Sequence, residues 1–275
     1  MIKEPFITST ANPRIKQIRR LRERKERQQS GLFYAEGLRI VIEAAHLGAG
    51  IQTLIAAPGL LTSQAGQQII RELGQQNVEI LEVGDEVFKS LAIKDDPQGI
   101  AAVIRQEWLP LDQVQLPSRE LWVALDSVAD PGNLGTILRT VDAVGGRGVI
   151  LLDQSTDPYD PTAVRASMGA VFSQKLVHAD FKTFADWKKR GGVHVTGTSG
   201  AAAEDYHLAR YPSGFVLLMG SERHGLKEEA LKLCDQVVSI PMAGHSDSLN
   251  LAVATAVVLY EVFNQQRDRK TEGNL

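Results

Sequence analysis

The chain has 275 residues, of which 43% are apolar and 23% charged, with 24 glycines and 11 prolines. This composition excludes collagen, a disordered chain and a disulfide scaffold, and the length allows one large or two modest domains. The single cysteine, Cys234, cannot form an internal disulfide and offers no cysteine-based metal site. No apolar run reaches the roughly 18 residues of a membrane span, and the N-terminus lacks an apolar signal stretch. We therefore expect a cytoplasmic protein without a membrane span or a cysteine-based metal site.

The net charge of −3 hides a basic N-terminal segment. Residues 1–39 carry ten Lys or Arg against four acidic residues, and eight of the ten lie within residues 14–27. The plain interpretation of such a run is a solvated helix face. Its density exceeds what solubility needs, so the run also favours contact with nucleic-acid phosphates.

Residues 1–105 predict a small α/β domain. Asn12 and Pro13 mark a helix start, and apolar residues then recur at helical spacing among the basic ones through residue 27. Residues 106–120 hold two prolines and no periodicity, which predicts a linker. Strands are expected at 32–36, 51–57, 78–83 and 99–104, and helices at 37–47 and 62–73.

Residues 121–265 show a clearer alternation of strands and helices, and a polar tail follows over residues 266–275. Strands that are apolar throughout and alternate with helices indicate a parallel sheet covered on both faces. Strands are expected at 121–126, 148–153, 193–198, 215–219 and 237–240, and helices at 134–144, 162–170, 225–233 and 249–263.

Common catalytic motifs are absent from the sequence. There is no P-loop, no G-x-G-x-x-G after a strand and no H-E-x-x-H. A hydrolase built from Ser221, His224 and Asp247 would need a G-x-S-x-G nucleophile elbow, which the chain lacks.

Three unusual stretches follow the carboxyl ends of predicted strands, where open α/β sheets bind their ligands. They are residues 126–139 (DSVADPGNLGTILR), 217–226 (LLMGSERHGL) and 240–252 (IPMAGHSDSLNLA). In order, they resemble the three signature motifs of the SpoU (TrmH-like) ribose 2′-O-methyltransferases of the SPOUT superfamily. Residues 157–169 (DPYDPTAVRASMG) are similar to the family's segment between motifs one and two.

The N-terminal domain is similar, through residues 33–37 (FYAEG), to a substrate-binding domain with a fold like ribosomal protein L30e. The resemblance implies an L30e-like α/β domain before a parallel-sheet SPOUT (α/β knot) catalytic domain. It also implies S-adenosylmethionine as methyl donor, no metal, an RNA substrate and a homodimer. The knot rests on resemblance alone, because chain-topology rules disfavour knots.

By resemblance, Arg139 is the catalytic arginine that is usually described as a general base. A guanidinium holds its proton tightly. Either charged, buried surroundings deprotonate it in part, or it stabilises the alkoxide while another group or the RNA phosphate takes the proton. The sequence leaves both open.

The other site residues also carry plain interpretations. Asn133 reads as a helix N-cap, Glu222 as a first-turn acid and Ser248 as the N-cap of the last helix. The resemblance places these three in the active site with Asn250. It assigns cofactor contacts to Gly220, Ile240, Met242 and Leu249, and we expect RNA contacts from Arg14, Lys16, Arg19, Arg20 and Arg22.

The resemblance favours 2′-O-methylation of 23S-type ribosomal RNA, because a domain of the L30e kind often accompanies rRNA enzymes. Transfer RNA is the alternative substrate. A non-catalytic RNA-binding assembly factor of the same fold is a further alternative, although a binder has no reason to keep the five active-site residues together. The nucleotide, and any link to antibiotic resistance, are left open.

Overall fold

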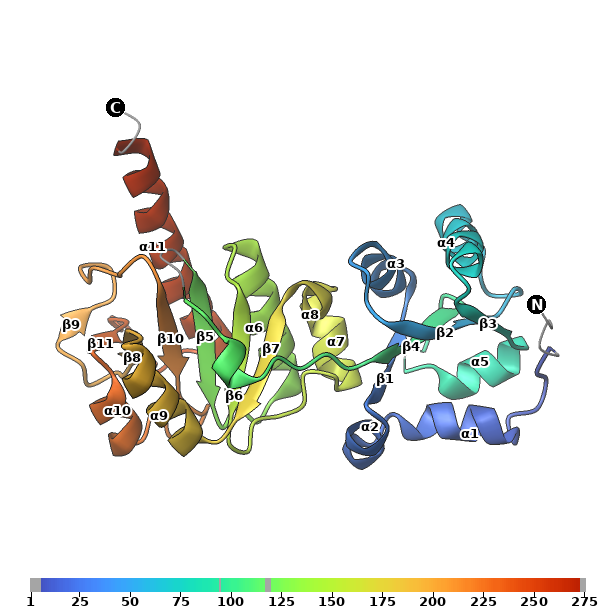
Figure 1. Cartoon of the computed structure of the whole chain (residues 1–275), viewed down its shortest axis with the longest axis horizontal. Helices are drawn as coiled ribbons and strands as arrows, with labels where there is room; N and C mark the ends of the chain where they lie inside the picture. The colour runs from blue at the N-terminus through green and yellow to red at the C-terminus, as the bar shows by residue number, and fades with distance from the viewer. Residues whose placement is uncertain (1–5, 94, 117–119, 273–275) are drawn as a thin grey trace. The chain divides into compact units, whose positions relative to one another are not determined.

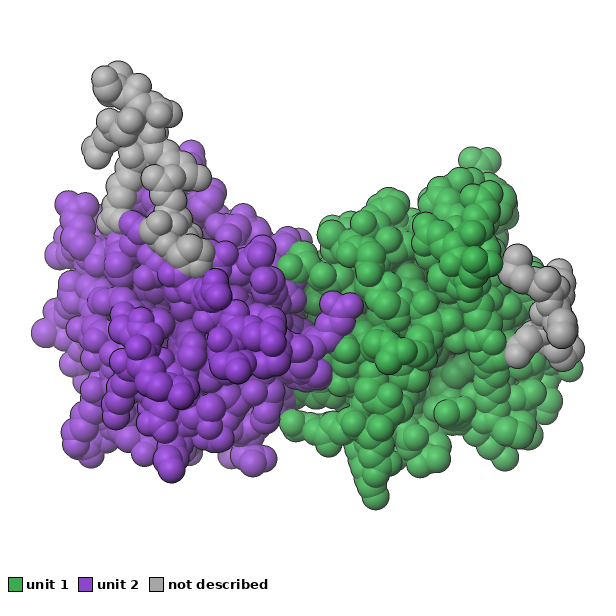
Figure 2. All heavy atoms as spheres, viewed as in Figure 1, with its two compact units in different colours: residues 1–106, 157–173 green, residues 107–156, 174–275 purple. Residues whose placement is uncertain are grey.

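The computed structural model describes residues 6–93, 95–116 and 120–272. Contacts divide the chain into two compact units: residues 1–106 with 157–173, and residues 107–156 with 174–275 (Figure 2). Parts of the expected linker (117–119) and of the expected tail (273–275) lie outside the described residues. None of the described helices is both long and apolar enough to cross a membrane.

The first unit is built on a four-stranded mixed sheet in the order β1-β4-β2-β3 (Figure 1). Strand β4 runs antiparallel to β1 and β2, whereas β2 and β3 are parallel. The strands are β1 (Leu32–Glu36), β2 (Ile51–Ala56), β3 (Glu79–Glu82) and β4 (Ile100–Arg105). The helices are α1 (Pro13–Arg20), α2 (Arg24–Ser30), α3 (Leu38–His46), α4 (Gln64–Gln75), α5 (Asp85–Leu91), α7 (Pro161–Ser167) and α8 (Ala170–Ser173).

Helix α1 begins where the sequence predicts. The side-chain oxygen of Asn12 accepts the backbone N–H of Arg14 at 2.8 Å, and Pro13 takes the first helical position. Ile15 and Ile18 are buried in the core of the unit. The chain turns over residues 21–23 before α2, so the basic run forms two short helices where one was expected.

A buried ion pair ties residues 157–173 to the first unit. The Arg27 side chain is 1% exposed, and it donates to the carboxylates of Asp157 at 2.7 Å and Asp160 at 3.3 Å. It also donates to two backbone carbonyls in the turn before α2, at 3.0 and 2.7 Å. A buried charge needs such partners because leaving it unpaired is costly. A segment that the sequence analysis placed with the second domain therefore packs in the core of the first unit.

The second unit contains a seven-stranded sheet in the order β7-β6-β5-β10-β8-β11-β9. All neighbouring strands are parallel, as predicted from the apolar runs of the five expected strands. Strands β7 and β9 were not expected. The strands are β5 (Leu121–Asp126), β6 (Gly148–Leu152), β7 (Lys175–Ala179), β8 (Val195–Thr198), β9 (Glu204–Asp205), β10 (Phe215–Met219) and β11 (Gln236–Ser239). The helices are η1 (Leu111–Gln113, 3-10), α6 (Pro131–Ala143), α9 (Phe181–Gly191), α10 (Glu228–Leu233) and α11 (Leu251–Glu272).

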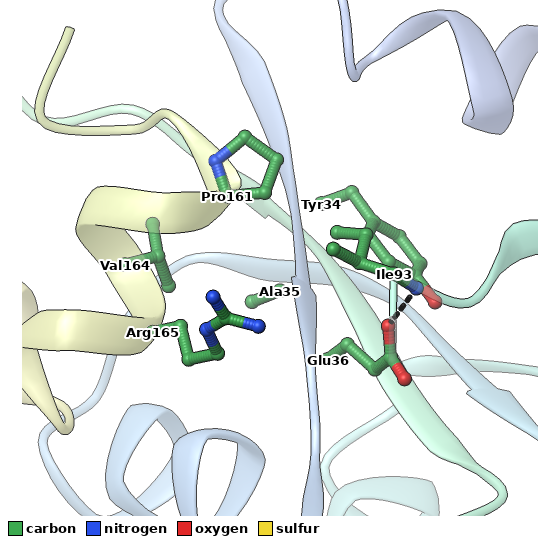
Figure 3. A pocket seen from close by; sticks show the side chains of 7 residues that line it. All are labelled: Tyr34, Ala35, Glu36, Ile93, Pro161, Val164 and Arg165. Atoms are coloured by element: carbon green, nitrogen blue, oxygen red, sulfur yellow. Dashed lines mark hydrogen bonds between the residues drawn. The ribbon is translucent and has the colours of Figure 1, made fainter. Parts of the chain in front are cut away.

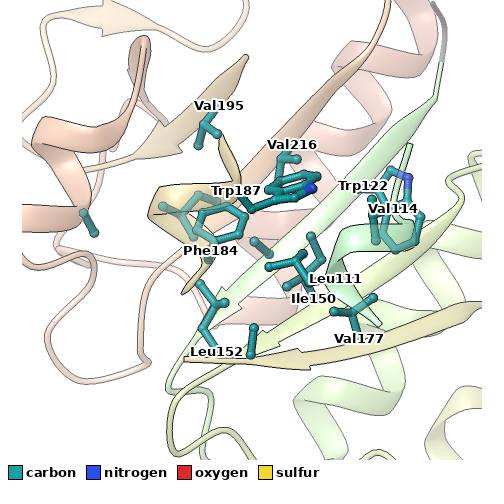
Figure 4. Close-up of a cluster of buried hydrophobic side chains, with 14 of the residues drawn as sticks. Leu111, Val114, Trp122, Ile150, Leu152, Val177, Phe184, Trp187, Val195 and Val216 are labelled. Atoms are coloured by element: carbon teal, nitrogen blue, oxygen red, sulfur yellow. The ribbon is translucent and has the colours of Figure 1, made fainter. Parts of the chain in front are cut away.

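The expected linker contributes to the core of this unit. Leu111 and Val114 are 7% and 5% exposed and belong to one apolar cluster with Trp122 and Trp187 (Figure 4). Residue 109 also donates a backbone hydrogen bond of 2.8 Å to strand β7. The segment was expected to be a linker because it contains two prolines and lacks hydrophobic periodicity. Its position is instead fixed by buried apolar side chains.

Three helical features differ from the expectation. Helices α5 and α9 were not predicted, although Asp180 caps α9 by accepting the N–H of Thr183 at 2.7 Å. Helix α11 continues to Glu272, well into the region expected to be a polar tail. Its extension has no strong apolar pattern, so periodicity could not reveal it.

Candidate active site at the carboxyl edge of the parallel sheet

The three unusual stretches follow strands β5, β10 and β11, which end at one edge of the same sheet. Strands β5 and β10 are neighbours, with Leu125 paired to Met219 at their carboxyl ends. Strand β8 separates β11 from β10 in the same sheet. The prediction that these stretches follow the carboxyl ends of strands in a parallel sheet is confirmed, and open α/β sheets bind their ligands at that edge.

The first stretch forms a strained turn and then a capped helix. Ser127 adopts a φ of 57°, a value uncommon for a residue with a side chain. Asp130 caps α6 by accepting the N–H of Asn133 at 2.7 Å, and Pro131 occupies the first helical position. The N-cap interpretation of Asn133 is therefore wrong. Its side-chain amide is left to make other contacts.

Glu222 joins the second stretch to the first. Its carboxylate accepts the backbone N–H groups of Ala129 and Asp130, both at 3.1 Å, and the side-chain amide of Asn133 at 3.3 Å. Burial alone would raise the pKa of Glu222, but these hydrogen bonds and one from its own backbone hold the pKa below its ordinary value. Helix α10 begins six residues later, so Glu222 is not the first-turn acid of that helix.

Asn250 brings in the third stretch. Its side-chain amide donates to the side-chain oxygen of Asn133 at 2.9 Å. Its own side-chain oxygen accepts two backbone N–H groups of the first turn of α11, at 2.9 and 3.3 Å. Glu222, Asn133 and Asn250 thus form one hydrogen-bonded chain that connects all three stretches, and we call it the motif network.

Ser248 was expected to cap α11, and this is wrong because Asn250 does so. Ser248 lies two residues earlier in an exposed loop, where its hydroxyl is 3.4 Å from the carboxylate of Asp247. Leu249 also precedes the helix instead of opening it. An asparagine directly before the helix reaches the first-turn N–H groups, which leaves the serine hydroxyl exposed.

Arg139 stands outside the motif network. It lies on α6, six positions after Asn133, so the two side chains leave the helix on different sides. Its side chain is exposed, and among the described residues it has neither a hydrogen bond nor an ion pair. The structure thus presents a guanidinium that is not engaged by the fold.

Gly220 marks a close approach of two backbone segments. A Cβ at this position would lie 2.0 Å from the carbonyl carbon of Gly225 and 2.2 Å from the nitrogen of Leu226. The loop between them is closed by two backbone hydrogen bonds between Ser221 and Gly225, at 3.0 and 3.2 Å. The fold itself requires glycine here, independently of any cofactor.

Apolar side chains are exposed at the same edge. Met242 and Leu249 are each 38% exposed in the loop between β11 and α11, and Ile240 at its start is half-buried. An exposed apolar surface of this kind gains free energy when it is covered by an apolar, flat heterocycle instead of water. Clusters of three or more His, Cys, Asp or Glu able to hold a metal are absent from the described part of the chain.

Known protein families match both units. Residues 120–260 match the SpoU rRNA Methylase family, and residues 12–102 match an MRM3-like substrate binding domain. The chain belongs to the SpoU rRNA methylase family. Every residue of the motif network, together with Arg139, lies inside the SpoU match.

Relatives and solved structures extend over nearly the whole chain. The 23S rRNA (guanosine(2553)-2′-O)-methyltransferase RlmP of Bacillus subtilis is 28% identical over 93% of this chain and 98% of its own length. The 23S rRNA (uridine(2479)-2′-O)-methyltransferase of Streptomyces viridochromogenes is 30% identical, over 91% and 89%. A crystal structure of an AdoMet-bound rRNA methyltransferase from Sinorhizobium meliloti matches with a TM-score of 0.88 and 38% identity, over 95% and 98%.

In this SpoU protein the five basic residues expected to bind RNA fall into two groups. Arg14 pairs with Glu79, and Arg19 donates to the hydroxyl of Ser90 at 2.8 Å. Arg22 donates to the last carbonyls of α5, at 2.8 and 2.6 Å. Lys16 is exposed, and Arg20 is exposed beside Glu26 at 2.5 Å. Three of the five side chains thus also serve the fold.

Residues 33–36 of the FYAEG segment lie on β1 and Gly37 follows it, and the segment is mainly structural. Glu36 accepts the backbone N–H of Ile93 at 2.6 Å, and Gly37 adopts a φ of 109° that favours glycine. Tyr34 and Glu36 line a cavity of about 20 Å³ with Arg165 of α7 (Figure 3). Such a cavity holds about one water molecule, so it is too small for a nucleotide.

Sequence reasoning missed Asp130 as the helix cap and Arg27 as a buried anchor. The first carried a signal, because Asp-Pro at residues 130–131 is typical of an N-cap followed by proline at the first helical position. The burial of Arg27 left no signal in the local sequence, since its acidic partners lie 130 and 133 residues away.

Proposed function

We propose that this chain is an S-adenosylmethionine-dependent methyltransferase that modifies a ribose 2′-hydroxyl in 23S-type ribosomal RNA. The observation that carries the proposal is the motif network, in which Glu222, Asn133 and Asn250 bind the three SpoU motifs together at the carboxyl edge of the sheet. Relatives that match more than nine-tenths of the chain are named as 23S rRNA 2′-O-methyltransferases. A non-catalytic binder would not need this network beside a disengaged arginine.

The exposed apolar loop fits S-adenosylmethionine. Met242 and Leu249 offer apolar surface for the adenine, and Ile240 lies at the base of the same loop. Gly220 follows β10 at the same edge, and we assign contacts with the ligand to its backbone groups. Catalytic metal is not needed for this chemistry, because the donor already carries an activated methyl group.

When bound, S-adenosylmethionine would supply a methyl group on a positively charged sulfur, which departs as a thioether when the 2′-oxygen attacks. Arg139 stabilises the negative charge that develops on this oxygen, because a guanidinium aimed at an oxyanion lowers the barrier. A guanidinium holds its proton tightly, and the exposed position of Arg139 favours this role over that of a base. The ribose proton passes to an RNA phosphate oxygen or to solvent water. The Ser248 hydroxyl is exposed in the same loop and can hydrogen-bond the ribose.

We also infer that the protein is a cytoplasmic homodimer. Helix α11 packs on α6 and leaves Val253 and Tyr260 exposed, at 49% and 47%, on one face seven residues apart. An apolar helix face of this kind is typical of an interface. Sedimentation velocity tests the dimer: Tyr260→Asp should shift the protein to monomer, and an unchanged mass would contradict it.

The decisive experiment maps 2′-O-methyl groups across total rRNA and tRNA from cells with and without the protein. One 23S rRNA ribose should lose its methyl group when the protein is absent and regain it with purified protein and S-adenosylmethionine. A site found only in tRNA would establish the alternative substrate. No site, with no calorimetric binding of S-adenosylmethionine, would reject the enzyme.

A further inference from the structure

A cavity of about 480 Å³ opens in the first unit between helix α1, the end of α2 and the four-stranded sheet. Pockets that hold small molecules span roughly 300–1,000 Å³, so this cavity is large enough for a nucleoside. The one beside the FYAEG segment, at about 20 Å³, is not.

The floor of the large cavity is apolar and fixed. Ile18, Leu21 and Val103 belong to the core of the unit, and partly buried Leu32 packs against them. Thr53 stands beside Val103 on the sheet, and its hydroxyl donates to Glu79 at 2.6 Å. Glu79 is in turn paired with Arg14, so its charge at the wall is neutralised. The floor therefore offers apolar side chains, and the charges of Glu79 and Arg14 beside them are paired with each other.

The rim carries two glutamine amides. Gln17 projects from α1 and Gln52 from β2, both exposed, and neither amide hydrogen-bonds to another described residue. The pairing of β2 with β4 skips one residue between Ile51 and Thr53, so Gln52 sits in a β-bulge. Bulges re-aim side chains and are frequent beside functional sites. A glutamine amide both donates and accepts, as the edge of a nucleobase requires.

Positive charge flanks the cavity on the solvent side of α1. Lys16 is exposed there, and Arg20 is exposed beside Glu26, a residue of the cavity wall. Phosphates that contact these side chains would lie beside the opening. An apolar floor, amide edges and flanking cations together match one nucleotide: base inside, phosphates outside.

We propose that this cavity takes a single unstacked nucleoside of the substrate RNA and thereby selects the target. The proposal rests on the proposed function, because it requires an RNA substrate. Sequence-specific RNA recognition generally uses bases splayed out of loops. The base inserts over Ile18, Leu21 and Val103, while Gln17 and Gln52 hydrogen-bond its edge.

Cavity-filling variants of the full-length protein test this. Gln17→Trp and Gln52→Trp should each raise the KM for 23S rRNA transcripts about tenfold or more, the scale of one lost base contact. The kcat and S-adenosylmethionine binding should stay within twofold. Gln28→Trp and Gln29→Trp are the matched controls, because both glutamines are exposed on α2 outside the cavity. Unchanged KM in both cavity variants, or equal effects in the controls, would overturn the proposal.

Photo-crosslinking to transcripts carrying 4-thiouridine or 6-thioguanosine gives a second readout, measured without S-adenosylmethionine. Cross-linked peptides should include residues 14–32 or 51–53, and the Trp variants should lose them. Cross-links confined to other peptides would overturn the proposal. This result is also expected if the cavity holds a protein segment instead of a nucleoside. Cross-linking measures RNA binding without methyl transfer. A negative result for the cavity can therefore be told apart from a negative result for the proposed methyltransferase activity.

Discussion

The side-chain amide of Asn250 donates to the side-chain oxygen of Asn133 at 2.9 Å, which ties the start of α11 to the first turn of α6. Asn250 also caps α11 with its other side-chain atom. One residue thus holds its own helix and aligns the neighbouring motif. Asn133 in turn donates to Glu222, so the three motifs depend on each other for position.

Replacing Asn250 by serine should separate its two roles. Serine caps a helix about as well as asparagine, so the melting temperature should remain close to that of the wild type. Its short side chain does not reach Asn133, and we expect methyl transfer to fall on the order of tenfold to a hundredfold because the motifs lose alignment. Asn250→Ala should lose both the helix cap and the contact with Asn133, and its free energy of unfolding should fall by about 1 kcal/mol. Full activity of Asn250→Ser would contradict the alignment role.

The hydrogen bonds of Glu222 predict how the stability of the protein depends on pH. Its folded pKa lies below the ordinary value, so its contribution to stability is present at neutral pH and is lost as pH falls through the folded pKa. Glu222→Gln turns an amide N–H toward backbone donors and should cost about 1 kcal/mol at pH 7. The difference in melting temperature from the wild type should stay constant between about pH 6 and 8 and shrink below about 4.3, the ordinary pKa of glutamate.

Glu229→Gln is the control for Glu222, because Glu229 is exposed on α10 and makes no hydrogen bond to another described residue. At pH 7 its melting temperature should stay closer to that of the wild type than the melting temperature of Glu222→Gln does. A difference for Glu222→Gln that grows below pH 4 would contradict the assignment of Glu222 as a carboxylate acceptor.

Arg139→Ala should abolish methylation without harming the fold. The side chain has no described partner and is exposed, so the free energy of unfolding should change by less than about 0.5 kcal/mol. Turnover should drop on the order of a hundredfold or more, because the developing oxyanion loses its charge partner. Calorimetry should show unchanged S-adenosylmethionine binding. The exposed Arg147 serves as control, and Arg139→Ala retaining over about a tenth of turnover would refute the role.

The centre of the parallel sheet was predictable because β5, β6 and β10 are buried throughout and read as continuous apolar runs. The edge that holds the site followed from those strands, since parallel strands end together. Strands β7 and β9 contain exposed polar residues and were not predicted. The caps were harder: Asp130 and Asn250 cap their helices, whereas Asn133 and Ser248 were the residues expected to do so. Several Asn, Ser and Asp residues stand near each helix start, and only the backbone path decides which one reaches the N–H groups.

Long-range packing marks the limit of sequence reasoning. Arg27 looked like one more member of a basic run, yet it is buried because Asp157 and Asp160 arrive from another part of the chain. Likewise Leu111 and Val114 looked like linker residues until the sheet supplied a surface to cover them. Local pattern carries no information about partners more than a hundred residues away.

Arg27→Met should destabilise the first unit strongly. The change leaves the nearly buried carboxylate of Asp157 without its cation, and breaking a buried pair costs about 3–5 kcal/mol. The double variant Arg27→Met, Asp157→Asn should recover part of that loss in urea unfolding. Arg20→Met is the comparison, because its exposed pair with Glu26 is worth about 0–1 kcal/mol. Equal effects of the two single variants would show that the buried pair has no special weight.

The basic residues of α1 and of the turn after it should differ in how strongly they affect the salt dependence of RNA binding. Lys16→Ala and Arg20→Ala should weaken rRNA binding, and each should lower the slope of log affinity against log salt by about 0.7–1, because one phosphate contact is lost. Both side chains are exposed, so the melting temperature should hold. Arg22→Ala should instead lower it, because the end of α5 loses hydrogen bonds of 2.8 and 2.6 Å. Filter binding from about 50 to 200 mM salt measures the slopes, and an unchanged slope for both exposed variants would remove α1 from the RNA contact surface.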